Sequence, residues 1–526
     1  MTKVEMLQKN KGKIWSYLQY IFVFLLFFVV QFKFVNDTWF GTDELDVMLG
    51  GKTIASGYQL YSDFSSQHMP FSYYISALFD ILGAKTVTMQ RIAFYLFYAL
   101  LWTIIYGRYK KIVSKKVLFF YPLCFLCLIC CYDMGTTILS EHLAGIGFII
   151  LLLEYLHFYK NRILKVDNYI AISISIILTF GTIFVAIFGV FAIAMGVLAR
   201  EIQWTLTEKK SFLLFLKEML RKYLPLAFWV ALPWVILGAY YFIVNNVRIA
   251  FFSAYTLNRA IYPKYNGYGE SILKTMLGSV DYFIGLVKGF FTLSDITFIT
   301  VVYAIVILLL IAAIVEIARK KEYILCVVLS VFLLFLGTRG YFNFHGTQWV
   351  EVAAFVITYY LCEVLVVNGK AFEQKRLYYR LTVAGMIFII ASAYLGTFSM
   401  LADRSLKEGE NGTSLIVGQI TDKNEGIWQL TFSNDVLMMA DRPSIQNVGA
   451  TPWGWEGHGA RVLAMYEQSS PRVVLYDEEH ECWGNKLKDY AQDLVAFMQE
   501  RYTRYGDTII YIRNDYYEEA CKILNE

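Results

Sequence analysis

The sequence predicts a polytopic α-helical membrane protein. Hydrophobic residues make up 57% of its 526 residues and charged residues only 17%, which is too apolar a composition for a soluble globular protein. Long apolar segments alternate with short basic ones, the pattern of repeated membrane crossing. The formal net charge of +4 comes from Lys and Arg residues between apolar segments. This charge therefore reports membrane orientation and gives no reason to expect a nucleic-acid partner.

The first span is expected at residues 14–35, which is long enough to cross a hydrocarbon core of about 30 Å. Lysines precede it at Lys3, Lys9, Lys11 and Lys13, so its N-terminus is expected in the cytoplasm. No small-residue cleavage site follows it, so the segment is interpreted as a retained anchor. The acidic loop at residues 36–79 is then expected outside the cytoplasm.

Ten further spans follow from the positive-inside rule, which gives about eleven transmembrane helices. They are expected at 87–107, 117–131, 137–158, 168–199 (two short helices), 223–247, 297–317, 323–337, 349–367 and 381–401. The segment 168–199 exceeds one crossing and carries Gly181, Gly189 and Gly196, which favours a broken helix. The mixed segment 272–291 is expected to lie along the membrane interface.

The chain is expected to divide into a transmembrane domain at 1–401 and a small α/β domain at 402–526. Apolar runs predict strands, and an amphipathic run predicts a helix, in the second domain: strands at 414–420, 473–477 and 508–513, and the helix at 485–501. Eleven crossings from a cytoplasmic start place this domain outside the cytoplasm. The sequence leaves open whether Cys482 and Cys521 form a disulfide there.

The acidic loop holds the first candidate site residues. If a helix begins near Thr42, Asp43 and Asp46 share one face, and Glu44 is turned away by about 100°. Carboxylates are the side chains that can take a proton from a hydroxyl nucleophile. Acids in a first helical turn also complement the helix dipole, which is the alternative, purely structural explanation.

Two other external turns carry charged side chains. Asp133 and Glu141 flank the turn between the third and fourth spans, and the sequence does not decide between them. Arg339 and His345 lie in the turn between the ninth and tenth spans, and such side chains bind phosphate. All these turns are expected to converge on one cavity at the outer membrane face. The alternatives are that Arg339 snorkels at a span end and that His345 is an interfacial polar residue.

A family resemblance rests on the motifs of the acidic loop. The sequences DEL at 43–45 and GYQLYSDFSSQHMPFSYY at 57–74 resemble the first external loop of GT-C membrane glycosyltransferases that use polyprenyl-phosphate-linked sugars. That group is related to the protein O-mannosyltransferases and to the aminoarabinose transferase of lipid A. The turn at 339–345 resembles the group's later Arg and aromatic-His segment, and the C-terminal region resembles its appended external domain. The group's segment often has two prolines after a basic residue, whereas here Pro70 stands alone.

The resemblance implies an inverting hexosyl- or pentosyltransferase. The absence of a targeting peptide favours a bacterial plasma membrane as its location. Such an enzyme would move a sugar from a polyprenyl-phosphate donor to an extracytoplasmic acceptor, which would be a cell-surface glycan, a glycolipid or a protein. Asp43 and Glu44 would be the catalytic acids, with Asp43 as the base. The implied substrate-binding residues are Tyr61, Asp63, His68, Glu141, Arg339 and His345. Whether a divalent cation, Mg²⁺ or Mn²⁺, is held by Asp43 and Glu141 stays open.

Two other functions fit a polytopic protein with charged external loops. A transporter or flippase of lipid-linked sugars would carry ionisable residues inside its spans, where this sequence offers Glu154, Glu316 and Glu363 near cytoplasmic ends and no repeated half. A glycan polymerase or ligase with lipid-diphosphate donors is chemically adjacent. The sequence does not name the sugar, the acceptor or the oligomeric state.

Overall fold

The chain forms two compact units. The computed structural model describes residues 3–32, 42–129, 137–266, 298–336, 346–365 and 412–525. Unit 1 comprises residues 1–39, 92–233 and 276–405, and unit 2 comprises residues 40–91, 234–275 and 406–526. The C-terminal residues therefore share a compact unit with the acidic loop that follows the first expected span.

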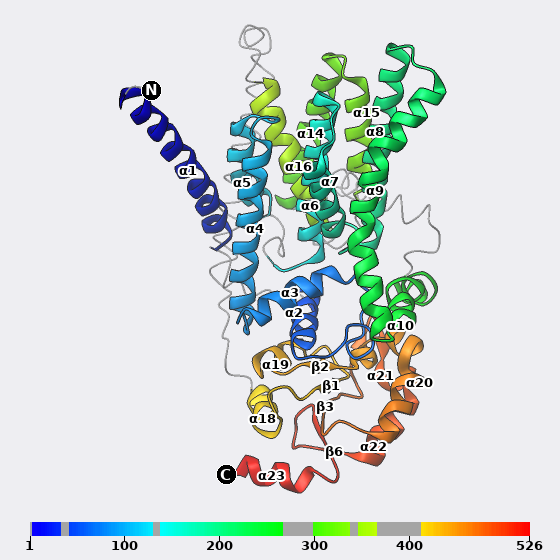
Figure 1. Ribbon diagram of the computed structural model, residues 1–526. Helices are drawn as coiled ribbons and strands as arrows, with labels where there is room; N and C mark the ends of the chain where they lie inside the picture. The colour runs from blue at the N-terminus through cyan, green and yellow to red at the C-terminus, as the bar shows by residue number, and fades with distance from the viewer. Residues whose placement is uncertain are drawn as a thin grey trace. The chain divides into compact units, whose positions relative to one another are not determined.

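Unit 1 is helical (Figure 1). Its elements are α1 (Lys3–Phe32), α4 (Val87–Tyr109), α5 (Lys115–Ile129), α6 (Ser140–Asn161), α7 (Val166–Leu178), the 3-10 turn η1 (Phe184–Ala186), α8 (Ile187–Thr207), α9 (Phe212–Ile243), α14 (Phe298–Arg319), α15 (Tyr323–Leu334), α16 (Thr347–Tyr359) and its π-helical extension η4 (Tyr360–Leu365). The first residues of α4 and the last of α9 belong to unit 2.

Apolar helices mark a multi-pass membrane protein. Among the described residues, four helical segments are long and apolar enough to cross a membrane: α4, α6, Phe184–Thr207 and α9. Shorter apolar helices cover Ile14–Val29, α7 and α15. Each expected span falls on a helix except the one at 381–401, which lies outside the described residues, as does the interfacial segment 272–291. The helical class is confirmed, and the total of eleven spans stays a prediction.

The predicted break in segment 168–199 is present, but only one of the three glycines lies in it. α7 ends at Leu178 and α8 begins at Ile187, with Gly181 in the turn between them. A Cβ on Gly189 would lie 2.7 Å from the Phe148 ring, and one on Gly196 would lie 2.6 Å from the Val328 side chain. These two glycines therefore let α8 approach α6 and α15 closely.

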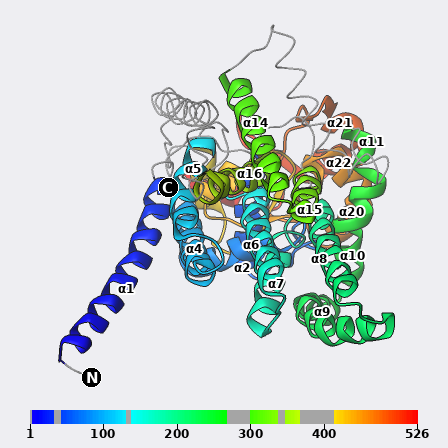
Figure 2. The same ribbon diagram turned by 90° about the horizontal axis from the view of Figure 1, so that it is seen from above.

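α6 is the buried centre of unit 1. It contacts α7, α8 and α16, and nearly all of its residues are buried. Figure 2 looks down the helices and shows α6 beside α7 and α16. Because α6 is apolar on all sides, it can be surrounded by other helices.

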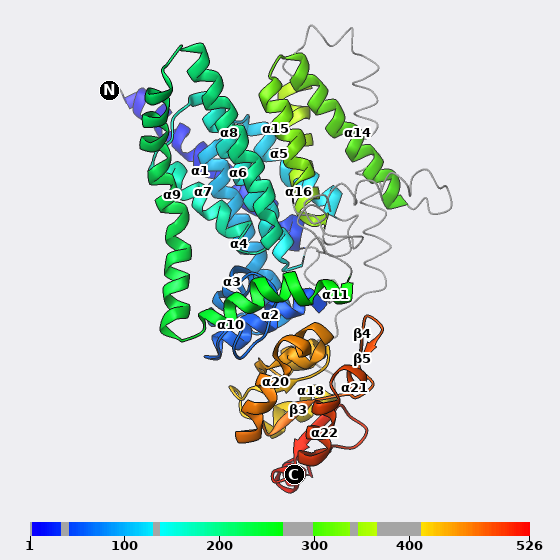
Figure 3. The same ribbon diagram turned by 90° about the vertical axis from the view of Figure 1, so that its right-hand side faces the viewer.

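Unit 2 mixes helices and short strands (Figure 3). Its helical elements are α2 (Thr42–Ala55), α3 (Phe71–Ile81), α10 (Val247–Phe251), the π-helical η2 (Phe252–Ile261), α11 (Pro263–Asn266), α18 (Gly412–Ile420), α19 (Asn434–Met439), η5 (Asn447–Ala450), α20 (Pro452–Gln468), α21 (Leu487–Tyr490), α22 (Gln492–Arg501) and α23 (Tyr517–Asn525). Its strands are β1 (Ile427–Gln429), β2 (Ser444–Ile445), β3 (Val473–Leu475), β4 (Glu481–Cys482), β5 (Asn485–Lys486), β6 (Tyr502–Arg504) and β7 (Ile510–Arg513).

The C-terminal residues form a mixed sheet of five strands in the order β2-β1-β3-β7-β6. β1 pairs in parallel with β2 and β3, whereas β7 pairs antiparallel with β3 and β6. The strands predicted at 473–477 and 508–513 are confirmed, and the predicted helix at 485–501 appears as α21 and α22. The strand predicted at 414–420 is wrong. That segment is α18, which buries Ser414, Val417 and Ile420 at the i, i+3 spacing of a helix.

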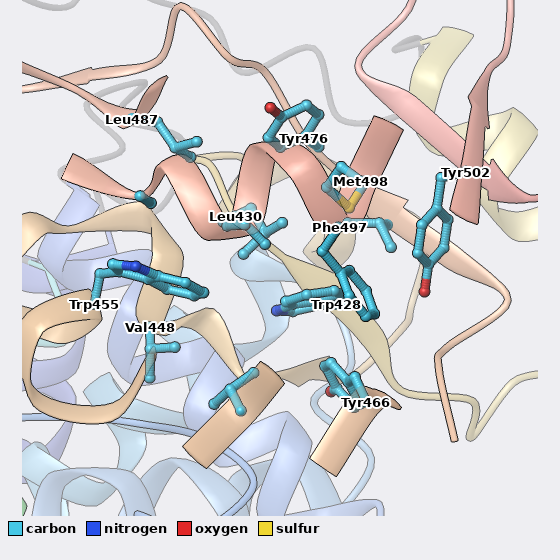
Figure 4. Packing of buried hydrophobic residues seen from close by; sticks show 14 residues of the cluster. Trp428, Leu430, Val448, Trp455, Tyr466, Tyr476, Leu487, Phe497, Met498 and Tyr502 are labelled. Carbon is cyan, nitrogen blue, oxygen red and sulfur yellow. The ribbon is translucent and has the colours of Figure 1, made fainter. Parts of the chain in front are cut away.

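Aromatic side chains fill the core beside this sheet (Figure 4). Trp428 packs edge-on against Tyr466 with ring centroids 4.5 Å apart, and its Nε1 donates to the backbone oxygen of Gln446 at 2.9 Å. Trp455 is buried in the same core and donates to Asp493 Oδ1 at 3.1 Å. Both indole N–H groups are thus satisfied, which is what burial of tryptophan requires.

Cys482 and Cys521 are free thiols in the structure, so the possible disulfide is not formed. Cys482 is buried in a cluster with Trp453 and Leu257. Burial raises the pKa of its thiol to about 12. Cys482 is therefore a small core side chain in this fold.

Candidate functional site

α2 carries the predicted catalytic acids, and its C-terminal half is held by buried polar contacts. Lys52 forms ion pairs with Asp80 of α3, at 3.3 Å, and with Asp441. Thr53 Oγ1 accepts a hydrogen bond from the backbone N–H of Ser444 at 3.0 Å. These contacts join the acidic loop to the C-terminal residues within unit 2, so the helix has a fixed support.

Glu44 lies in a buried ion pair with Arg91. Arg91 Nε donates to Glu44 Oε1 at 2.9 Å, and Arg91 Nη2 donates to Oε2 at 2.6 Å. The two side chains are only 0% and 1% exposed. A bidentate guanidinium holds a carboxylate in one orientation. The geometry thus fixes the Glu44 carboxylate at the start of α2, and its role as a catalytic acid stays a prediction.

Asp43 is partly exposed and shares a helix face with Asp46, as predicted. The Asp46 carboxyl accepts a hydrogen bond from Tyr73 Oη at 2.5 Å. Burial raises the pKa of Asp46 to about 7, the Tyr73 hydrogen bond opposes the rise, and the charge of Asp43 adds to it. The two carboxylates therefore interact electrostatically, and Asp46 titrates near neutral pH.

Tyr73 reaches Asp46 because α2 presents a glycine to its ring. A Cβ on Gly50 would lie 2.4 Å from the Tyr73 ring, so a larger residue would displace it. Ser66 Oγ lies 2.7 Å from Tyr73 Oη and accepts from the backbone N–H of His68 at 2.9 Å. A hydrogen-bonded chain thus runs from the motif segment at 57–70 to Asp46.

The motif residues hold that segment in shape. Tyr61 is buried with φ +74°, and its hydroxyl donates to the backbone oxygen of His68 at 2.8 Å. Burial raises the pKa of Tyr61 well above its ordinary value, so it is a neutral donor. Asp63 Oδ2 accepts from the backbone N–H of Gln59 at 2.8 Å. Asp63 and His68 are both partly exposed, whereas Tyr61 is buried.

In unit 1, Glu141 lies in the first turn of α6 and is mostly buried. The next residue, His142, forms a buried pair through Nδ1 with Glu351 of α16. Tyr98 of α4 donates its hydroxyl to the other oxygen of Glu351 at 2.5 Å. Three helices therefore meet at one carboxylate beside Glu141.

Three predicted residues, Asp133, Arg339 and His345, lie outside the described residues. Asp43 belongs to unit 2 and Glu141 to unit 1, so their convergence on one cavity stays a prediction. Where the structure is described, no group of three or more His, Cys, Asp or Glu side chains is placed to hold a metal ion. The cation considered at Asp43 and Glu141 stays a prediction.

Sequence reasoning missed Arg91 and Glu351. Arg91 stands at the start of an apolar helix, where a basic residue is ordinarily counted for orientation alone. Glu351 is an acid inside the predicted span 349–367, and such a residue is a functional candidate by itself. That signal was present in the sequence, whereas nothing local identified His142 as the partner of Glu351.

The fold has relatives among solved structures. The chain is similar to ArnT from Cupriavidus metallidurans bound to undecaprenyl phosphate, with a TM-score of 0.54, 12% identity, and coverage of 95% of this chain and 97% of that chain. It is also similar to ArnT from the same organism in the apo state, with a TM-score of 0.52, 12% identity, and coverage of 95% and 98%. No protein-family model and no curated protein matches the sequence. The chain therefore has an ArnT-like GT-C fold, which confirms the resemblance inferred from the acidic loop at the level of the fold.

Proposed function

We propose that the protein is an inverting glycosyltransferase that moves a sugar from a polyprenyl-phosphate donor to an acceptor hydroxyl outside the cytoplasm. The acceptor would be a cell-surface glycan, a glycolipid or a protein, and the sugar a hexose or a pentose. The single observation that carries the proposal is the fold likeness over 95% of this chain to a protein solved with undecaprenyl phosphate. The acids at the start of α2 supply the chemistry this reaction needs.

In the proposed reaction, the acceptor oxygen attacks the anomeric carbon from the face opposite the phosphate. The bond between that carbon and the phosphate oxygen breaks, and the polyprenyl phosphate leaves with the electron pair. Asp43 takes the proton of the acceptor hydroxyl, because it is the partly exposed carboxylate of the first turn. Attack opposite the leaving group inverts the configuration of the anomeric carbon.

The other acids of α2 support Asp43. Glu44, fixed by Arg91, sets the position of the first turn, and Asp46 lies on the same face as Asp43. His68, Arg339, His345 and Glu141 stay the predicted partners of the donor phosphate and sugar, and Tyr61 and Asp63 shape the segment that carries His68. A Mg²⁺ or Mn²⁺ ion stays a prediction, and no step above depends on it. We place the C-terminal residues and the acidic loop outside the cytoplasm, as the basic loops predict.

Transfer of radiolabelled sugar from a panel of polyprenyl-monophosphate sugars, by purified protein with membranes as the acceptor source, tests the proposal. Asp43→Asn should lower transfer by at least about a hundredfold, because a positioned base contributes on the order of 10²–10⁴ in rate. Asp507→Asn, at an exposed position of unit 2, is the matched control and should keep full activity.

Full activity in Asp43→Asn would remove that residue from the mechanism. A protein that moves lipid-linked sugars between vesicle leaflets without forming a glycosidic bond would be a flippase. Transfer from lipid-diphosphate donors alone would identify a polymerase or ligase.

A further inference from the structure

A charged hollow lies where α9 begins, beside the short turn that joins α8 to α9 (Figure 3). Its volume is about 240 Å³, and its walls come from unit 1 alone: the residue after α6, one residue of α8, the turn and α9. α9 contributes four residues at the i, i+3, i+4, i+7 spacing of one helix face: Phe215, Glu218, Met219 and Lys222. This volume is below the roughly 300–1,000 Å³ of pockets for drug-sized ligands, so it suits a small polar group.

The charges around the hollow balance one another. Its lining has three cations and two carboxylates: Arg162, Lys210, Lys222, Glu201 and Glu218. Glu208 adds a third carboxylate, because it pairs with both Arg162 and Lys210. A ligand with negative charge alone would leave carboxylates without a counterion, whereas a ligand with one charge of each sign keeps the balance.

One ion pair at the hollow holds the helices together. Lys222 Nζ of α9 lies 2.5 Å from Glu201 Oε1 of α8, and the two side chains are mostly buried. Tyr223 Oη donates to the same carboxylate oxygen at 2.9 Å, and Lys222 also donates to the backbone oxygen of Arg162 at 3.1 Å. This pair therefore fixes the walls of the hollow.

The other ion pairs are more open to solvent. Lys210 lies 2.6 Å from Glu218 Oε2, and the Glu218 side chain is 48% exposed. Arg162 pairs with Glu208, and these side chains are 31% and 39% exposed. Pairs of this kind contribute only about 0–1 kcal/mol each, so their members can exchange partners with a ligand at little cost.

The hollow lies at the depth expected for lipid head groups. The first three turns of α9 precede the expected span at 223–247, and Arg162 and Lys210 belong to basic loops expected at the cytoplasmic face. On the face of α9 opposite the hollow, three leucines are 77%, 58% and 69% exposed: Leu213, Leu220 and Leu224. A helix with a charged face and an exposed apolar face is typical of the membrane interface.

We propose that this hollow binds the head group of a glycerophospholipid that carries both a phosphate and a primary ammonium group. The phosphate accepts hydrogen bonds from Arg162 and Lys210. The ammonium group donates to the carboxylates of Glu208 and Glu218, which those two cations release. Every charge thus keeps a partner of opposite sign when the lipid binds.

The remaining lining residues suit the rest of the lipid. Phe215 and Met219 are the apolar members of the wall, and they are placed to contact the glycerol and the first acyl carbons. Lys222 and Glu201 stay paired, so binding does not separate α8 from α9. The inference is independent of the proposed sugar transfer, because the hollow is expected at the cytoplasmic face and the transfer outside.

Native mass spectrometry of the full-length protein tests the proposal with three lipids that have the same acyl chains. Phosphatidylethanolamine carries both groups, phosphatidylglycerol lacks the ammonium group, and phosphatidylcholine has a quaternary nitrogen that donates no hydrogen bond. We expect phosphatidylethanolamine to bind at least about tenfold more tightly than the other two, because they lose the charge-assisted hydrogen bonds to the carboxylates.

Two variants test the two halves of the site. Glu218→Gln should weaken phosphatidylethanolamine binding by roughly tenfold and leave phosphatidylglycerol binding unchanged or tighter. Lys210→Gln should weaken the binding of both lipids, because it removes a phosphate contact. Both side chains are partly exposed, so the variants should fold. Lys209→Gln, at an exposed position of the same turn outside the hollow, is the matched control and should bind like the wild type.

Equal affinity of the wild type for the three lipids would overturn the inference, and so would phosphatidylethanolamine binding that neither Glu218→Gln nor Lys210→Gln changes. Tighter binding of phosphatidylglycerol would overturn it as well, because the carboxylates would then have no role. Free phosphoethanolamine at millimolar concentration that displaces the lipid would support recognition of the head group alone. Lack of displacement, with the Glu218 effect kept, would support a site for the intact lipid. Lipid selectivity without any sugar transfer would keep this site and refute the proposed function.

Discussion

Glu44 and Asp46 stand two residues apart on α2, and the protein stabilises them in opposite ways. Glu44 is buried against the guanidinium of Arg91, so it can stay charged. Asp46 accepts a hydrogen bond from the Tyr73 hydroxyl. Burial raises the pKa of Asp46 and so favours its protonated form, and the nearby charge of Asp43 adds to this rise. The same helix turn thus holds Glu44, which is paired with a cation, and Asp46, whose pKa is shifted toward neutral pH.

The Asp46 carboxyl should make stability depend on pH. Its pKa is raised from 3.8 to about 7 in the folded protein, mainly by burial. A raised pKa means that the folded state binds the proton more tightly, so this contribution is complete below about pH 4 and lost as the pH rises through 7. The loss amounts to about 4 kcal/mol at most. Asp46→Asn should flatten the fall of the unfolding temperature between pH 4 and 7, and an unchanged slope would show that Asp46 does not titrate there.

Arg91→Met should destabilise the protein by about 3–5 kcal/mol, because it removes the guanidinium that balances the buried Glu44 carboxylate. The double variant Glu44→Met with Arg91→Met should recover most of that loss, since no charge stays buried. Thermal unfolding in detergent measures both. Glu479→Gln, at an exposed pair with Lys486, is the control and should leave the unfolding temperature unchanged. Equal losses in the single and double variants would contradict this account of the pair.

At the scale of the elements, glycines decide how closely helices of unit 1 approach α6. Gly147 faces α7, where a Cβ would lie 2.8 Å from the Thr179 side chain and 3.0 Å from the Ser175 backbone oxygen. The Ser175 backbone cannot move aside as a side chain can. Gly145 faces a side chain instead, because a Cβ there would lie 2.3 Å from Glu351 Oε2. α6 therefore combines an apolar surface with small residues where neighbours come closest, as membrane helices do.

Gly147→Ala should lower stability by about 1–3 kcal/mol, because the added methyl forces α6 and α7 apart. Gly238→Ala is the matched control on α9, where a Cβ would meet nothing within 4 Å. It should be neutral or stabilising by up to about 1 kcal/mol, since alanine favours a helix more than glycine does. Unfolding of both variants in the same detergent gives the comparison. Equal changes in stability for the two variants would mean that helix propensity, and not packing against α7, decides the effect of alanine at these positions.

At the scale of the whole molecule, the sequence predicted what is local. The apolar runs and basic loops located helices such as α4 and α6, and the spacing of Asp43 and Asp46 placed them on one face of α2. Pairings between distant segments leave no local pattern: Lys52 and Asp441 are 389 positions apart, and His142 and Glu351 are 209 apart. The strand predicted at 414–420 failed because β-branched residues outweighed a helical burial pattern that only the packed fold makes visible.

Orientation is the property of the whole chain on which the proposed chemistry depends. The basic loops predict the turn between α4 and α5 in the cytoplasm and the C-terminal residues outside. We therefore expect a membrane-impermeant maleimide to label Lys423→Cys in intact spheroplasts and Lys111→Cys only after permeabilisation, in a chain with its eight native cysteines replaced. Both positions are exposed, so access to the reagent depends on the membrane and not on packing. The reverse pattern would put Asp43, which shares a compact unit with the C-terminal residues, on the cytoplasmic side. Transfer to an external acceptor would then be impossible, whatever the geometry of α2.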